Sequence, residues 1–338
     1  MKRLQLFILI LLLSSLAFAT SISSPAATVK LTENVVISKT DLSNEVAKYK
    51  AMGYTNVTES DVLDAIIEEK LIMQGAKRDG YYVDDRNLEA IYSNQKASIE
   101  AQAGQTLTDE QFEQFVIQQV GSVQEYKESL RKQATLQEYV SAKKSDILQN
   151  VKQPTDREIT NYYRQNQTSF SQAYMVRVSV ITFAKSGDEA KDKETIALAN
   201  DVYNQIKSGK LTFEKGVQIY STDNASKSKG GDVNWLVDNE ISRQAVGDEF
   251  VERVIELDVG EIDGVIETPS DYTIAKVTAS QDAKILSLSD PIQPDSTVTV
   301  KEYIREGLLY QNSQIAYMNA YTSLVNDLKS EAVIKKFI

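Results

Sequence analysis

A nearly continuous series of helical segments between Thr58 and Val151 constrains the fold of this chain more than any other feature. Predicted helices start near Thr58, Asp85, Thr108 and Val123, and the last one runs to about Gln149. In each helix apolar residues recur every three or four positions, so one side must be covered. The main members of these stripes are Ile66, Ile72, Phe112, Phe115, Val116, Leu130 and Leu136. Because the stripes cannot all remain in water, the helices must pack on one another or on another part of the chain.

The sequence changes character at Met175, where alternating apolar and β-branched residues through Phe183 predict a strand. Helices are predicted over 190–207, 213–220 and 248–257, and a second strand over 272–278. Together these segments predict a compact α+β unit, so the expected fold class is α+β with a mostly helical remainder.

The regions before residue 58 and after residue 284 are predicted to contain only a few elements. Residues 28–38 form an extended piece, followed by a helix that Thr40 and Asp41 cap. Pro291 and Pro294 mark a linker, after which helices are predicted from Lys301 and across Ser313 to Leu328.

The first residues have the three parts of a secretory signal peptide. Lys2 and Arg3 precede an apolar run over 4–13, and Ala17-Phe18-Ala19 provides a cleavage motif. The alternative is a membrane anchor, but the run is shorter than the ~20 residues that span a bilayer. We therefore expect cleavage after Ala19 and export to a bacterial periplasm.

Composition excludes several kinds of chemistry. The chain has no histidine and no cysteine, so it cannot form a Ser-His-Asp triad, a cysteine nucleophile, a disulfide, or a thiolate or imidazole metal site. Asp84-Asp85 and Asp109-Glu110 could in principle bind a cation, but both pairs stand at helix starts, where carboxylates favour the dipole. The net charge of −11 argues against nucleic acid as a partner. No metal and no cofactor are expected.

Five ordered sequence blocks carry a resemblance to a known family. They are Ser179–Phe183, Tyr220–Asp223, Gly230–Trp235, Phe250–Leu257 with Gly260-Glu261-Ile262, and Asp271–Val277. Residues 174–279 thereby resemble the parvulin family of peptidyl-prolyl isomerases (rotamases). The whole layout, with a signal peptide, N-terminal helices, a parvulin-like unit and a helical tail, resembles the SurA/PrsA class of exported foldase-chaperones.

The resemblance implies a degenerate catalytic centre. Val180 and Thr273 occupy the two positions where the family has histidines. Asp223 is the one residue of the family's polar network that this chain retains, and Ser221 is a further hydrogen-bonding group. These two are the candidate catalytic residues. The expected isomerase activity is therefore far below that of a parvulin with both imidazoles, or absent.

The resemblance also implies a cup for a proline ring. Phe250, Trp235 and Ile241 are the candidate substrate-binding residues, with Ile241 in place of the family's methionine next to an insertion over 242–247. A purely structural alternative stays open, in which Phe250 and Trp235 are core residues and Asp223 caps a loop.

By resemblance, the chain divides into five parts. These are a signal peptide over 1–19, a helical chaperone domain over 20–155, a connecting helix over 156–173, a parvulin-like domain over 174–280, and a C-terminal linker and helices over 281–338 that pack on the N-terminal domain. The N-terminal helices and the C-terminal helix would thus form one mostly helical module with the parvulin-like domain inserted between them.

The expected function is that of a periplasmic, ATP-independent chaperone with weak or absent isomerase activity. Its partners would be unfolded or extended polypeptides, including outer-membrane proteins, held on the helical module rather than in the proline cup. One alternative is an active isomerase of X-Pro bonds, and another is a passive scaffold that uses the parvulin fold as a spacer. Neither nucleic acid binding nor stable membrane insertion is expected once the signal peptide is removed.

Overall fold

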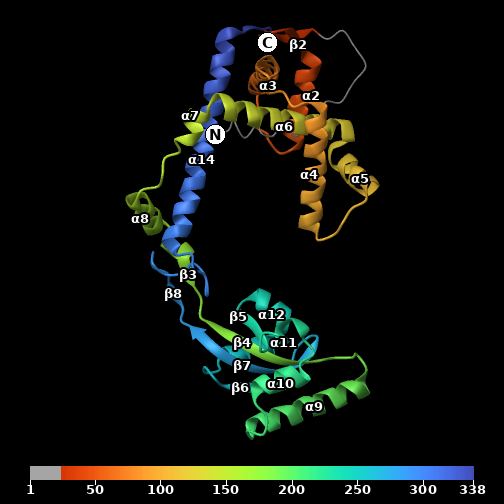
Figure 1. The fold of residues 1–338 in the computed structure, drawn as a ribbon, viewed down its shortest axis with the longest axis vertical. Coiled ribbons are helices and arrows are strands. Elements are labelled where there is room, and N and C mark those ends of the chain that lie inside the picture. The colour runs from red at the N-terminus through yellow and green to blue at the C-terminus, as the bar shows by residue number, and fades with distance from the viewer. Residues whose placement is uncertain (1–23) are drawn as a thin grey trace. The chain divides into compact units, whose positions relative to one another are not determined.

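The computed structural model describes residues 24–338, which divide into two compact units (Figure 1). Unit 1 contains the chain up to Pro154 together with Gly307–Ile338, and unit 2 contains Thr155–Glu306. The expected signal peptide lies outside the described residues. Among residues 24–338, no helix is both long enough and apolar enough to cross a membrane.

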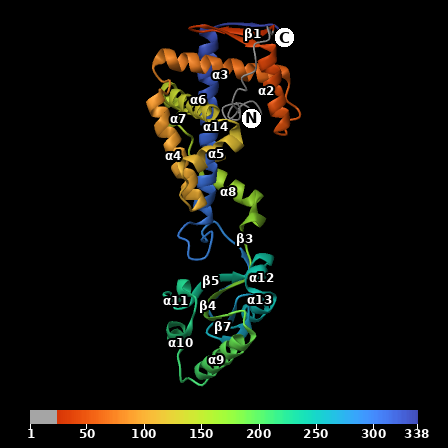
Figure 2. The same cartoon turned by 90° about the vertical axis from the view of Figure 1, so that its right-hand side faces the viewer.

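Unit 1 contains a three-stranded antiparallel sheet in which the two ends of the described chain meet. The segment expected to be extended forms a hairpin of β1 (Pro25–Lys30) and β2 (Asn34–Ser38). β1 also pairs with β9 (Val333–Lys336), which gives the strand order β2-β1-β9. α3 lies against β1 (Figure 2). The terminal apolar piece is therefore an integral strand of the unit.

The helices of unit 1 begin close to the positions that the sequence indicates. They are α2 (Lys39–Ala51), α3 (Glu59–Asp79), α4 (Asp85–Ala103), α5 (Asp109–Val120), α6 (Val123–Lys143), α7 (Ser145–Gln149) and α14 (Val300–Glu331), the last of which starts in unit 2. Capping boxes at Thr58 and Thr108 confirm two predicted starts. α2 starts earlier than predicted, because Ser38 rather than Thr40 accepts the Asp41 amide. The helix expected to reach Gln149 is interrupted at Lys144.

The C-terminal part of the chain completes the core of unit 1. Residues 300–331 form one helix of 32 residues, not the two helices expected. Its buried side chains in unit 1 include Ala320, Tyr321, Leu324, Val325 and Leu328, which share one cluster with side chains of α3 and α6. Of the seven stripe residues identified in the sequence, six are buried, and Phe115 is 42% exposed. Most of the apolar stripes therefore stabilise the fold itself.

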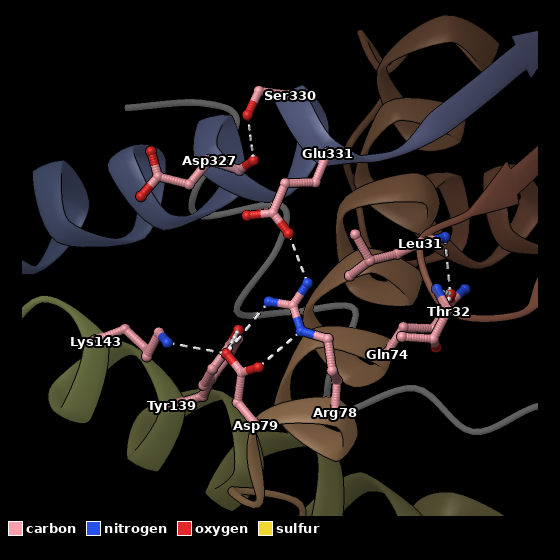
Figure 3. A network of polar contacts seen from close by, with 10 residues as sticks. All are labelled: Leu31, Thr32, Gln74, Arg78, Asp79, Tyr139, Lys143, Asp327, Ser330 and Glu331. Atoms are coloured by element: carbon pink, nitrogen blue, oxygen red, sulfur yellow. Dashed lines mark hydrogen bonds and ion pairs between the residues drawn. The ribbon is translucent and has the colours of Figure 1, made fainter.

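A polar network joins α3, α6 and the end of α14 beside this core (Figure 3). Asp79 accepts hydrogen bonds from Arg78 Nε at 2.7 Å and from the Tyr139 hydroxyl at 2.8 Å, and Lys143 Nζ lies 3.0 Å from it. Arg78 also donates to Glu331 at 2.6 Å. The Arg78 hydrogen bonds hold the pKa of Asp79 well below its ordinary range. Tyr139 is fully buried, so its hydroxyl needs this acceptor.

A second buried polar group closes the turn between β1 and β2. Gln74 of α3 is 4% exposed, and its Oε1 accepts from the backbone amides of Leu31 and Thr32 at 3.0 and 2.9 Å (Figure 3). It also accepts from the Glu33 amide at 3.2 Å. These amides lie in the turn, where the strand ladder supplies no acceptor. The hairpin is thus tied to α3 by a side chain as well as by apolar packing.

Unit 2 is built on a four-stranded antiparallel sheet of order β5-β4-β7-β6. Its strands are β4 (Met175–Ala184), β5 (Asp232–Val237), β6 (Ile262–Glu267) and β7 (Asp271–Gln281), and its helices are α8 (Asp156–Gln165), α9 (Glu189–Lys207), α10 (Phe213–Tyr220), α11 (Asn224–Lys227), α12 (Glu240–Val246) and α13 (Asp248–Ile255). β4 alternates as predicted, with Ile181 and Phe183 packing toward α9 and α10, and Val178 and Val180 toward α13. Helices therefore cover both faces of the sheet (Figure 1).

Two very short strands stand where the chain enters and leaves this sheet. β3 (Ser171–Gln172) pairs with β8 (Lys284–Ile285), and Gln172 lies opposite Lys284. The chain thus arrives at the four-stranded sheet and departs from it at adjacent positions.

Candidate functional site

A cavity of about 480 Å³ lies in unit 2 beside the edge strand β5. We call it the Trp235 cavity. Its walls come from β4, β5, the end of α12, α13 and the start of β7, and among its lining residues are Val180, Thr182, Asp223, Trp235, Phe250 and Thr273. The structure thereby brings together five of the seven residues that the resemblance singled out.

The apolar wall of the cavity contains two of the three residues expected to bind substrate. Phe250 is 4% exposed and packs with Val178 and Val254 beneath the cavity, so it is both a core residue and part of the wall. Trp235 is half-buried, and its indole N–H donates to Asp295 at 3.0 Å. Two aromatic side chains in its lining give the cavity the character of a binding site for an apolar group.

Ile241 does not belong to this wall. It lies in the first turn of α12, which begins after the Asn239 cap, and its side chain is 79% exposed. The last turn of the same helix supplies Ala245 and Val246 to the cavity instead. The expected role of Ile241 is therefore corrected, because the 242–247 insertion forms a helix whose far end, not its start, reaches the site.

The two positions that correspond to the family's histidines both lie in the Trp235 cavity. Val180 is 4% exposed and Thr273 is 3% exposed. They are diagonal neighbours on paired strands, since Val180 is opposite Ala275 and Thr182 is opposite Thr273. Neither side chain accepts or releases a proton near neutral pH, so this part of the cavity offers no acid or base.

Asp223 is the cap of α11. Its Oδ1 accepts from the Ala225 amide at 3.0 Å, and its Oδ2 accepts from the Ser226 amide at 3.2 Å. The Ser226 hydroxyl and these two amides hold the pKa of the Asp223 carboxyl below its ordinary value. The group is therefore ionised, and its lone pairs are partly occupied by the local turn.

Ser221 does not line the cavity. It is 3% exposed, and its hydroxyl oxygen accepts from the Thr182 amide at 3.2 Å. The Thr182 hydroxyl, in turn, accepts from the Asp223 amide at 3.0 Å. Ser221 thus orders the backbone behind the site rather than facing a ligand.

Thr182 and Asp271 are among the lining residues that reasoning from the sequence missed. Thr182 points to the same face of β4 as Val180, and the two-residue period of a strand would have identified it. Asp271 lines the cavity and accepts from the Ser270 hydroxyl at 2.5 Å, but no local pattern marks it. In the described part of the chain, no group of three or more acidic residues is arranged to hold a metal ion.

Residues 154–290 match the family model of the PPIC-type PPIASE domain. This segment is a parvulin domain. The resemblance inferred from the five sequence blocks is thereby confirmed, and the Trp235 cavity lies inside the parvulin domain. The match covers less than half of the chain.

Relatives extend the similarity beyond the parvulin domain. The chain is 26% identical over 228 residues to "Foldase protein PrsA" of Caldanaerobacter subterraneus subsp. tengcongensis, which covers 68% of this chain and 59% of the relative. It is 25% identical over 261 residues to "Chaperone SurA" of Nitrosococcus oceani, which covers 74% of this chain and 57% of the relative. The chain thus spans less than two thirds of the length of these relatives. Both alignments are longer than the parvulin match, so the similarity extends beyond that segment.

Solved structures include a chain described with two SurA-like chaperones, PEB4 and Cj1289, of Campylobacter jejuni. That structure covers 89% of this chain at 17% identity, with a TM-score of 0.35.

Proposed function

We propose that this chain is an ATP-independent chaperone that holds unfolded exported polypeptides on its helical unit 1, and that its parvulin domain binds apolar or proline-containing segments with weak or no isomerase activity. The observation that carries the proposal is the composition of the Trp235 cavity. It retains Phe250 and Trp235 as an apolar wall, whereas Val180 and Thr273 stand in the two histidine positions. Relatives named chaperone and foldase support the same class of function.

The physical reason lies in the difference between binding and catalysis. Rotation about an X-Pro bond has an uncatalysed barrier close to the ~18–20 kcal/mol of a peptide bond, because amide resonance is lost. A site accelerates the rotation only if it binds the twisted amide better than the planar one. Apolar contacts with Phe250 stabilise the planar and the twisted amide alike. The Asp223 carboxylate already accepts hydrogen bonds from the Ala225 and Ser226 amides of its own turn. The cavity therefore favours binding over rate enhancement.

The proposed compartment rests on the N-terminal pattern, and the proposed clients rest on the resemblance to the SurA/PrsA class. The basic start, apolar run and Ala17-Phe18-Ala19 motif support export, and we place the mature protein in the periplasm with outer-membrane proteins among its clients. The net charge of −11 disfavours nucleic acid as a partner.

Excision of the parvulin domain should leave chaperone activity in place. Because Gln172 and Lys284 are paired in the β3-β8 ladder, an Asn-Gly turn can replace residues 173–283 without separating the chain ends. We expect this variant to suppress aggregation of an unfolded client about as well as the full chain, since the proposal assigns holding to the helical unit.

Phe250→Ala in the full chain serves as the matched control and should also leave suppression unchanged. If the excised variant is helical by circular dichroism and melts cooperatively, yet no longer protects the client, holding must be assigned to the parvulin domain.

Isomerase activity should be low. On a proline tetrapeptide, we expect kcat/KM about two to three decades below that of a parvulin that has both histidines, which corresponds to a loss of ~3–4 kcal/mol of transition-state stabilisation. The two proteins are compared in one assay at equal concentration. Equal values would contradict the proposal and would identify the chain as an active isomerase instead.

A further inference from the structure

The segment between β8 and α14, residues 286–299, folds back on itself. The Ile292 amide donates to the Val298 carbonyl at 2.9 Å, and Pro291 and Thr299 form an isolated antiparallel bridge. Within this loop Asp295 has a φ of 62°, a left-handed conformation that is uncommon for a residue with a side chain. The segment expected to be a simple linker is therefore an ordered loop, and Asp295 stands within it in a left-handed conformation.

One oxygen of the Asp295 carboxylate accepts two hydrogen bonds from the four-stranded sheet. Arg177 Nη1 donates to it at 2.7 Å, and Trp235 Nε1 donates to it at 3.0 Å. Arg177 also donates to Asp232 from Nε at 3.0 Å and from Nη2 at 2.5 Å. Since Arg177 and Trp235 are opposite each other in the β4-β5 register, the carboxylate joins a cross-strand pair.

Trp235 connects this contact to the cavity. An indole has a single N–H, so the position of its acceptor determines where the ring lies while that hydrogen bond is kept. Asp295 does not line the Trp235 cavity itself but lines a separate cavity of about 310 Å³ together with Gln293 and Pro294. Asp295 therefore acts on the Trp235 cavity through the indole.

We propose that Asp295 is a positioning residue that holds the Trp235 indole in the wall of the cavity and thereby sets its affinity for apolar, proline-containing segments. The inference rests on the proposed function of the cavity. It assigns the loop over 286–299 to the binding site, although Asp295 and the rest of the loop from residue 291 onward lie outside the matched parvulin segment.

Tryptophan fluorescence tests the first half of this inference directly, because Trp235 is the single tryptophan of the chain. Asp295→Ala should shift the emission maximum to longer wavelength and raise the acrylamide quenching constant by about half or more. Asp295→Asn keeps a carbonyl oxygen that can accept the hydrogen bond from the indole N–H, so the emission of this variant should stay close to that of the wild-type protein. Asp290→Asn is the matched control, since Asp290 contacts Ser287 and Lys284 and touches neither Trp235 nor Arg177.

Calorimetric titration with an Ala-Phe-Pro-Phe peptide tests the second half without relying on the indole signal. Asp295→Ala removes the hydrogen bond that positions the indole, together with the Arg177 contact. A hydrogen bond of ordinary strength at the indole predicts that this variant weakens binding about three- to ten-fold, with Asp295→Asn and Asp290→Asn within about two-fold. Unchanged emission in Asp295→Ala would overturn the positioning role, and shifted emission with unchanged affinity would overturn the link to binding. If the wild-type protein binds no peptide, the proposed function of the cavity is contradicted, and the inference about Asp295 fails with it. If the wild-type protein and all three variants bind the peptide with equal affinity, only the inference about Asp295 is contradicted.

Discussion

Gly231→Ala should destabilise the parvulin domain by about 3 kcal/mol or more and abolish an intact Trp235 cavity. Gly231 has a φ of 85°, and a Cβ atom there would lie 2.5 Å from the Val180 carbonyl oxygen, 3.1 Å from its amide nitrogen and 3.0 Å from Val217 Cγ2. The backbone cannot simply move away, because the Val180 amide donates to the Gly231 carbonyl at 2.8 Å. Since Val180 is part of the cavity wall, the clash falls on the candidate site as well as on the fold.

Gly230→Ala provides the control for the backbone conformation. Gly230 has a φ of 70°, and nothing lies within 4 Å of the position its Cβ would take, so only the left-handed conformation should cost energy, about 1–2 kcal/mol. Urea unfolding followed by Trp235 fluorescence measures both variants in the domain concerned. Equal losses of unfolding free energy would show that the close approach of Gly231 to Val180 has no energetic consequence.

Leu328→Ala should destabilise unit 1 by about 2–5 kcal/mol. Leu328 is 1% exposed and lies in the cluster that α14 shares with α3 and α6. The Leu328 side chain packs closely against α3 at Gly75. A Cβ atom at Gly75 would lie only 2.7 Å from Leu328 Cδ2 and 2.8 Å from the Tyr139 hydroxyl. Truncating Leu328 therefore leaves a cavity where three helices meet, and rigid neighbours cannot collapse into it without loss.

Ile315→Ala is the matched control on the same helix. Ile315 is 57% exposed, so its truncation should change the free energy of unfolding by no more than about 0.5 kcal/mol. Thermal or urea unfolding followed by circular dichroism at the helix band compares the two variants. A loss for Leu328→Ala as small as that for Ile315→Ala would mean that α14 contributes little to the core of unit 1.

Features set by residues near one another in the chain were predictable. The boxes at Thr58 and Thr108, the exact span of α10 and the alternation of β4 depend on side chains within a few positions of the backbone they order. The absence of histidine likewise excluded imidazole chemistry at Val180 and Thr273 before any fold was known. Even the parvulin domain was recognisable, because its motifs are short blocks that keep their order.

Features that join distant segments were decided by the tertiary structure alone. The pairing of β1 with β9 brings together residues some three hundred positions apart, and the burial of Leu328 joins α14 to α3 about 250 positions earlier. No local hydrogen-bonding pattern encodes either contact. The same holds for the Trp235 cavity, where Ile241 points to solvent while Val246 faces the site.

The sequence by itself determined which groups this protein has for chemistry and where most helices begin, because these depend on residue identity and on neighbours within one turn. Only the tertiary structure decided which of those groups face one cavity, and that Asp295 reaches the Trp235 indole from a loop 60 positions away. Side-chain orientation depends on packing and on hydrogen-bond partners that folding alone brings into contact.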